Sequence, residues 1–148
     1  MKHREAAMEY FKQGYNCAQA VAMAFCDVTG LTEEESAKMA SSFGGGLGRM
    51  REVCGAVSGM ALVVGILYGY SDPKDLEAKK DHYALVQKLA GKFREANGSI
   101  VCRELLGDHS AIRSAPDART EEYYKKRPCV ELVGMAADIL DEEIKDRA

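Results

Sequence analysis

Five cysteines are the residues of this chain best suited to chemistry: Cys17, Cys26, Cys54, Cys102 and Cys129. The count is odd and high for a cytoplasmic chain, which favours metal binding or redox exchange over a structural disulfide framework. No two cysteines form a CxxC pair, so no local motif supports thioredoxin-type exchange, a zinc ribbon, covalent haem or a ferredoxin run. Any shared site must therefore be assembled by the fold from distant segments.

The placement of the cysteines separates four of them from the fifth. Cys17, Cys54 and Cys129 each open a predicted helix, and Cys102 lies in or beside a short one. A thiol at a helix N-terminus faces unpaired backbone N–H groups and the positive end of the helix dipole. Both favour the thiolate, which is the form that attacks, ligates or exchanges. Cys26 lies deep inside its predicted helix, and we expect it to be a small core residue.

A glycine-rich stretch over residues 43–59 leads into the helix that begins at Cys54. It is no phosphate-binding loop, because it lacks both the GxxxxGK[ST] lysine and a preceding strand. Arg49 and Arg51 either raise the positive potential around Cys54 or are solvated. Glycines without a Cβ allow a bound cofactor or another backbone to come close. The glycines expected to do so are Gly45, Gly46 and Gly55.

Helical periodicity and capping residues predict the secondary structure. Asn16 can cap one helix, and Thr32 with Glu35 matches a capping box. No stretch alternates with period 2, so we predict one all-α domain over residues 1–148, a compact bundle of about five to seven helices. The longer helices are predicted at 2–13, 17–29, 32–42, 54–69, 73–96 and 129–145, with shorter helical segments around 102 and 120–127.

The helix at 54–69 is predicted to be the buried, glycine-rich centre of this bundle. From 55 to 69 no residue is charged, and the run is shorter than the about 20 residues that a membrane-spanning helix needs. Such a helix is typical of one buried on all sides. Ser58, Ala61, Gly65 and Gly69 form a stripe of small side chains, which predicts close packing of a neighbouring helix there.

Composition and charge exclude several partners. A net charge of −3 and an isoelectric point near 5.7 argue against nucleic acid, and no segment suggests a membrane span or a signal peptide. We expect a cytoplasmic protein. Near-heptad apolar positions along 73–96 predict that this helix or its neighbour packs in a homodimer. His3 and His82 are expected at the surface, and His109 is either a ligand near Cys102 or a solvated loop residue.

The motifs resemble those of a family of small redox-active proteins named for a CGAxxG motif and its cysteines. Cys54-Gly55-Ala56-Val57-Ser58-Gly59 matches the motif, and Asn16-Cys17-Ala18-Gln19, Phe43-Gly44-Gly45-Gly46, Cys102 and Cys129 fall where that family has its remaining pattern. The resemblance covers about residues 10–135 and leaves Cys26 outside the pattern. It implies redox activity that uses the four characteristic cysteines. A more distant similarity to the cysteine-bearing part of split-Soret cytochromes implies an iron–sulfur cluster, and the absence of haem motifs implies no haem.

Three functions follow from these observations. In the first, Cys17, Cys54, Cys102 and Cys129 bind a [2Fe–2S] cluster that transfers electrons to an unidentified partner, with zinc as the alternative metal. In the second, the protein is a metal-free thiol oxidoreductase or redox sensor in which Cys54 attacks and another of the four resolves. In the third, it is a helical interaction module whose cysteines are inert or bind structural zinc.

Overall fold

The computed structural model describes residues 2–107, 112 and 114–148, and within them the fold is all-α, as predicted. It shows one isolated bridge and no strand in that part of the chain. None of the helices described there is both long enough and apolar enough to cross a membrane. The helices are α1 (Lys2–Lys12), α2 (Cys17–Ala24), α3 (Cys26–Thr29), α4 (Glu33–Ala40), the 3₁₀ helix η1 (Ser41–Phe43), α5 (Gly55–Tyr68), α6 (Leu76–Asn97), α7 (Cys102–Leu106), α8 (Glu121–Lys126) and α9 (Cys129–Arg147).

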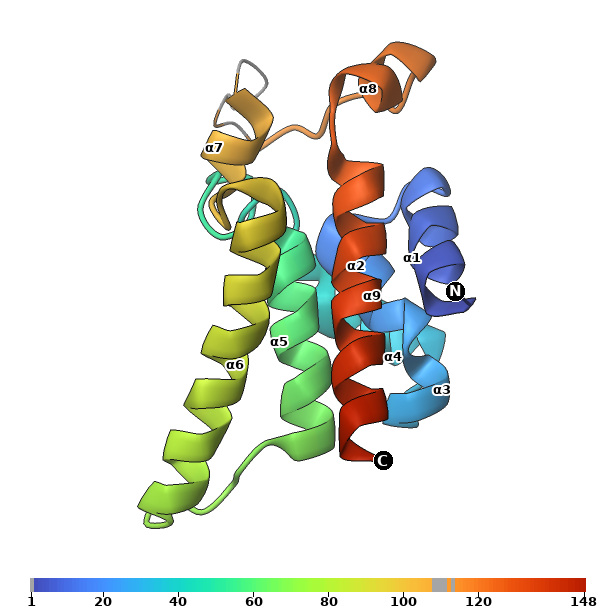
Figure 1. The fold of residues 1–148 in the computed structure, drawn as a ribbon. Helices are drawn as coiled ribbons and strands as arrows, with labels where there is room; N and C mark the ends of the chain where they lie inside the picture. Colours follow the sequence, from blue (N-terminus) through green and yellow to red (C-terminus); the bar gives the residue numbers. More distant parts are fainter. Residues whose placement is uncertain (1, 108–111, 113) are drawn as a thin grey trace.

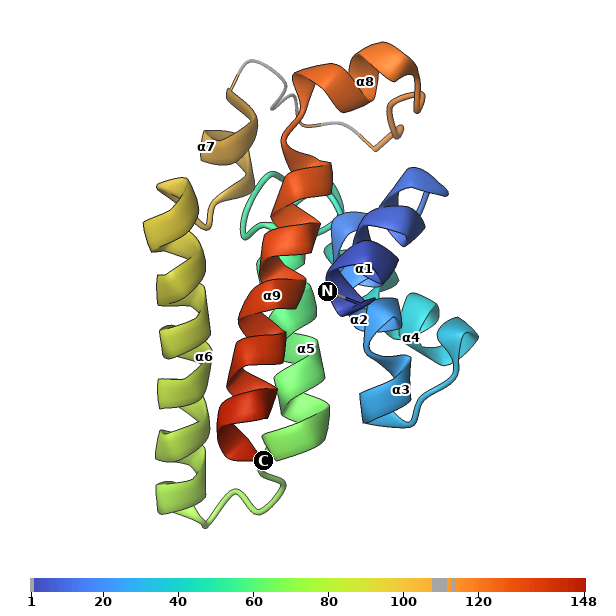
Figure 2. The same ribbon diagram turned by 45° about the vertical axis from the view of Figure 1, so that its right-hand side comes forward.

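The helices form two neighbouring groups around one core. Helices α5, α6 and α9 run alongside one another, and α1 to α4 gather on the other side of α5 and α9 (Figures 1 and 2). Helix α2 joins the groups, because it packs against α1, α4, α5 and α9. The starts of α5 and α9 lie at the same end of the bundle as α7 and α8, the upper end in Figure 1. Segments far apart in sequence therefore meet at that end.

Capping residues set most helix boundaries as the sequence predicts. Asn16 and Thr32 both form complete capping boxes, and Gly98 ends α6 in the left-handed conformation. Two boundaries differ. The predicted helix at 17–29 is interrupted at Phe25, and α6 begins after Asp75, whose side chain accepts a hydrogen bond from the backbone of Ala78, rather than at Pro73. Proline suits a helix start but also suits the turn found there.

The prediction that α5 is buried on all sides is wrong. Its first half is buried, but Gly65 and Ile66 are exposed, and a Cβ built on Gly65 would meet no atom within 4 Å. The predicted stripe of small residues therefore does not pack a neighbour at Gly65. Close packing occurs instead on the face of α5 that carries Gly55 and Gly59, which lie against α2. Helix α2 is the most completely buried helix, with only Gln19 outside the core.

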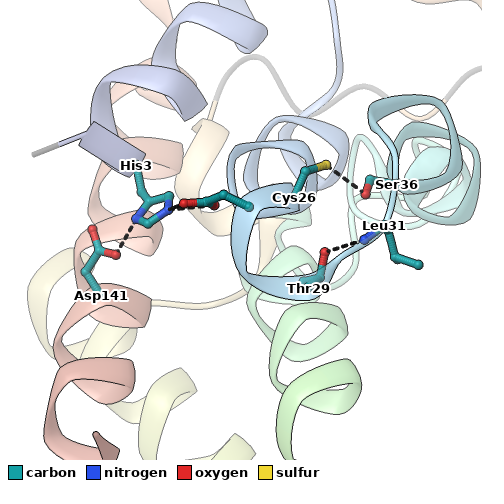
Figure 3. A network of polar contacts seen from close by, with 7 residues as sticks. His3, Cys26, Thr29, Leu31, Ser36 and Asp141 are labelled. Atoms are coloured by element: carbon teal, nitrogen blue, oxygen red, sulfur yellow. Dashed lines mark hydrogen bonds and ion pairs between the residues drawn. The ribbon is translucent and has the colours of Figure 1, made fainter.

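His3 is part of a polar network that ties α1 to α3 and α9 (Figure 3), which corrects the expectation that it is a surface residue. Its Nδ1 lies 2.6 Å from Asp141 Oδ1 and its Nε2 lies 2.9 Å from Asp27 Oδ1, while the ring stacks on Phe25. Cys26 is half-buried beside this network, and its Sγ lies 3.2 Å from Ser36 Oγ, so it is not the core residue predicted.

Glu143 is the buried charge that links α9 to α6. Its side chain is only 3% exposed, its Oε1 pairs with Lys88 Nζ at 2.8 Å, and its Oε2 accepts a hydrogen bond from Arg147 Nε at 2.7 Å. The Lys88 ammonium, followed by Arg147, holds the pKa of Glu143 below its usual range despite burial. A lowered folded pKa contributes stability above the unfolded pKa, which is lost as the pH falls through the folded value.

Glu143→Gln is therefore expected to lower the free energy of unfolding at pH 7 by about 1–2 kcal/mol. This is less than for a fully buried ion pair, because Lys88 and Arg147 are partly exposed to solvent. The difference should vanish once the pH has fallen below the lowered folded pKa of Glu143, where the wild-type carboxyl is also neutral. Urea denaturation at both pH values measures it, with the exposed neighbour Glu142→Gln as the control. A difference that stays constant with pH would contradict this role for the charge.

Candidate functional site

The four cysteines singled out by their placement line one cavity of about 360 Å³ at the upper end of the bundle. They are 3–9% exposed, and none of the chain's five cysteines forms a disulfide. Cys26 is not among the lining residues. The fold therefore assembles the set that the sequence predicted and leaves out the cysteine that it excluded. The lining thiols belong to Cys17, Cys54, Cys102 and Cys129.

Helix starts place each of these thiols. Cys17 is the first residue of α2, directly after the cap that Asn16 provides. Cys54 is the N-cap residue of α5, and Cys129 is the first residue of α9 after Pro128. Cys102 begins the short helix α7. The predicted positions at helix starts are confirmed for all four. The prediction that Cys26 lies deep inside a helix is wrong, because the break at Phe25 makes Cys26 the first residue of α3, so a helix start alone does not distinguish the four.

Two short segments pair side by side and bring Cys54 and Cys102 together. The backbone N–H of Cys54 donates to the carbonyl of Ile100 at 2.7 Å, and that of Cys102 donates to the carbonyl of Glu52 at 2.6 Å. An antiparallel bridge lies between these two bonds. The starts of α5 and α7 are therefore joined by main-chain bonds, which do not depend on the side chains around them.

The glycine-rich loop covers the cavity in an unusual backbone conformation. Residues 45–49 all have φ between 56° and 73°, and Arg51 has φ of 63°. Glycine adopts this left-handed region readily, but each non-glycine residue costs about 1–2 kcal/mol there. Leu47, Arg49 and Arg51 bear that cost. Leu47 is exposed, whereas Arg49 and Arg51 are buried and line the cavity.

Two of the predicted close-approach glycines lie directly against cysteines. A Cβ on Gly46 would lie 2.7 Å from Cys102 Cβ, and a Cβ on Gly55 would lie 3.0 Å from Cys17 Cβ. Gly45 also lines the cavity, against the backbone of Arg49. These glycines let the loop and α5 come close enough to place the thiols. Their contact with a bound cofactor stays a prediction.

Cys17 and Cys129 form the most closely coupled pair of thiols. Interaction with the Cys17 thiol lowers the pKa of Cys129, and interaction with the Cys129 thiol raises that of Cys17. Arg127, Arg119 and Arg51 lower the pKa of Cys129 further. Cys129 is therefore the cysteine whose surroundings most favour a thiolate.

Cys54 differs from the thiolate expected at a helix N-terminus. Burial raises the pKa of Cys54 to about 12, although the backbone N–H groups of Ala56 and Val57 act in the opposite direction. Burial also raises the pKa of Cys102, against a hydrogen bond from Arg51 that lowers it. The helix start thus supplies the expected donors, but removal from water outweighs them at Cys54.

Arginines dominate the polar lining of the cavity. Arg127 Nη2 lies 2.5 Å and Arg49 Nη2 lies 3.1 Å from Asp117 Oδ2. Arg119 lies over the Phe11 ring, 4.2 Å from its centroid, and donates to the Phe11 carbonyl. The sequence reasoning missed Arg119, Arg127 and Asp117. Of these, only Arg127 could have been recognised from the sequence, because it lies two residues before Cys129.

The four thiols surround the cavity without converging on a single point. Among the described residues, no group of three or more His, Cys, Asp or Glu side chains lies close enough to hold one metal ion. A tetrahedral zinc needs four ligand atoms about 2.0–2.3 Å from one centre. The predicted ligand role of His109 cannot be placed, because that residue lies outside the described part of the chain.

Comparison with known proteins adds a family and one relative. Residues 15–143 match the sequence model of the family described as "Putative redox-active protein (C_GCAxxG_C_C)". An uncharacterised protein of Archaeoglobus fulgidus is 27% identical over 154 aligned residues, which cover 99% of this chain and 95% of that protein. No solved structure matches the chain. The family match includes all four cysteines of the cavity.

Proposed function

Because the chain belongs to the C_GCAxxG_C_C family of redox-active proteins, we propose that its four cavity cysteines bind an iron–sulfur cluster, [2Fe–2S] in type, that transfers electrons. The observation that carries this proposal is that four thiols, rather than two, line one buried cavity. Disulfide exchange needs two cysteines, whereas a cluster of this type is held by four.

The donor set fits a cluster better than a single zinc ion. Thiolates are the soft ligands that both iron–sulfur clusters and zinc prefer. A cluster distributes its ligands over more than one iron, so its sulfurs need not meet at one point. The thiols here surround a cavity of about 360 Å³ and do not converge on one ion. Zinc would require them to move together.

The chain itself provides the surroundings that an anionic redox centre needs. When bound, the cluster supplies one-electron oxidation and reduction. Burial of the cysteines excludes water from the sulfurs, and the arginines offset negative charge inside the cavity. Hydrogen bonds to the sulfurs and limited solvent access are among the features that set the reduction potential of such a centre. Leu47 and Met50 belong to the loop that lines the cavity and are exposed, and we propose that they contact an electron-transfer partner.

Protein purified without oxygen is expected to be brown, with about two iron and two sulfide ions per cluster and a visible absorption that dithionite bleaches. Metal and sulfide analysis with absorption spectroscopy measures this. A colourless preparation with one tightly bound zinc ion would contradict the cluster and support a structural metal site.

A second candidate is metal-free disulfide exchange, favoured because Cys17 and Cys129 line the same cavity and the pKa of Cys129 is lowered by Cys17 and by the nearby arginines. The Cys129 thiolate would attack a substrate disulfide, form a mixed disulfide and release one substrate thiolate. Cys17, after losing its proton, would attack Cys129 and release the second thiolate, so that two electrons reach the substrate. A colourless, metal-free protein that forms a specific Cys17–Cys129 disulfide under mild oxidation would support this candidate. Cys129 replaces Cys54 as the attacking residue here.

A further inference from the structure

We propose that Arg51 sets the reduction potential of the redox centre by donating a hydrogen bond to the sulfur of Cys102. The proposal rests on the redox function proposed above. Arg51 Nη1 lies 3.7 Å from Cys102 Sγ, within the range of an N–H···S hydrogen bond, and both residues are buried. Among the described residues, Arg51 is the side chain for which the structure shows a hydrogen bond to a cavity sulfur.

Main-chain hydrogen bonds hold the backbone of Arg51 beside that of Cys102. The Arg51 N–H donates to the Gly45 carbonyl at 3.1 Å, and the Arg51 carbonyl accepts from the Arg103 N–H at 3.2 Å. Arg103 directly follows Cys102, so Arg51 and Cys102 are held by the same main-chain pairing. The main-chain bonds therefore hold the backbone of Arg51 within reach of the Cys102 sulfur.

Backbone strain at Arg51 points in the same direction. Its φ of 63° lies in the left-handed region, where glycine would cost nothing and arginine costs about 1–2 kcal/mol. Strained residues persist where the surrounding structure or the function requires the side chain. Leu47 bears the same strain with its side chain exposed, whereas Arg51 is buried against a sulfur.

The electrostatic effect follows from the location of the added electron. One-electron reduction of the oxidised centre by dithionite adds one negative charge, breaks no bond and needs no proton. Part of that charge resides on the cysteine sulfurs, where an N–H donor stabilises it in a site of low dielectric constant. Stabilising the reduced form raises the potential, so removal of the donor makes the potential more negative.

Arg49 provides a matched comparison within the same loop. It lines the same cavity, has φ of 64° and carries the same charge. Its guanidinium group, however, contacts the Asp117 carboxylate and the Ala115 carbonyl. A contribution from general positive charge should therefore be shared by both arginines, whereas a sulfur hydrogen bond should be specific to Arg51.

The test is a redox titration of wild type, Arg51→Gln, Arg51→Lys and Arg49→Gln, with visible absorbance as the readout. The four proteins are compared at equal iron and sulfide contents. We expect Arg51→Gln to lower the equilibrium constant for reduction about tenfold, which makes the midpoint potential ~59 mV more negative for a one-electron couple. Arg51→Lys, which keeps the charge but not the guanidinium, should shift it less, and Arg49→Gln least. Equal shifts in Arg51→Gln and Arg49→Gln, or no shift in Arg51→Gln, would overturn the proposal.

Failure of the cluster itself gives a separate result. If the wild type contains no iron, the potential of its thiol–disulfide couple is measured by alkylation in glutathione buffers. If that couple includes Cys102, the same order of potentials would support Arg51, because a donor to the Cys102 sulfur stabilises its reduced form. A couple formed by Cys17 and Cys129 instead would overturn the proposal for Arg51. If Arg51→Gln does not bind the cluster, the midpoint potentials of Arg51→Lys and Arg49→Gln decide. A larger shift in Arg51→Lys would support the proposal, and a larger shift in Arg49→Gln would overturn it. A wild type with neither couple would overturn both proposals.

Discussion

Cys102→Ser is expected to remove the visible absorption of the anaerobically purified protein and to lower its iron content to background. Serine keeps the size of the side chain but replaces a soft thiolate by a hydroxyl, which is a poor ligand for iron. The sulfur of Cys102 lines the cavity beside Gly46 and accepts the hydrogen bond of Arg51. Serine at Cys17, Cys54 or Cys129 should have the same effect.

Cys26→Ala is the matched control for these variants. Cys26 is a half-buried thiol beside Ser36 and does not line the cavity. This variant should keep its iron and colour and lose at most about 1 kcal/mol of stability, the value of one hydrogen bond. Loss of colour in Cys26→Ala together with its retention in Cys102→Ser would show that the wrong four cysteines were chosen.

Gly59→Leu is expected to lower the free energy of unfolding by about 3 kcal/mol, the upper end of the usual cost of overpacking. A Cβ at this position would lie 2.9 Å from Val21 Cβ and 3.0 Å from the Ala18 carbonyl oxygen, so α5 would have to move away from α2. Chemical denaturation monitored by circular dichroism measures the change. Because α2 and α5 carry Cys17 and Cys54, the iron content should fall as well.

Gly65→Ala tests whether close packing, rather than loss of glycine, is responsible. Gly65 lies on the same helix, and a Cβ added there would meet no atom within 4 Å. Alanine favours a helix over glycine by about 0.5–1 kcal/mol, so this variant should be slightly more stable than wild type. Equal destabilisation by both substitutions would contradict the packing of α5 against α2.

Features encoded by neighbouring residues could be predicted from the sequence. The capping boxes at Asn16 and Thr32 need only the residues that follow them, and both form as predicted. The selection of four cysteines also depended on local position, at helix starts, and on the family resemblance. The cavity confirms that these four lie together, while the cluster and the homodimer remain predictions.

Features that depend on tertiary packing could not be predicted. The raised pKa of Cys54 results from burial, which competes with the local donors of its helix start. Arg119 reaches the cavity only because its segment folds back onto Phe11, far away in sequence. The uncharged sequence of α5 suggested complete burial, yet Gly65 and Ile66 are exposed because neighbouring helices cover only part of α5. Each of these depends on which elements become neighbours.

The distribution of the four thiols over the chain also determines when the centre can be completed during protein synthesis. Cys17, Cys54 and Cys102 emerge from the ribosome before Cys129, and the main-chain pairing that joins the starts of α5 and α7 can form without α9. The cavity nevertheless needs α9, because α9 supplies both the last thiol and a wall of the core. Insertion of the proposed cluster would therefore follow translation of α9, because a nascent chain that ends earlier lacks the fourth thiol.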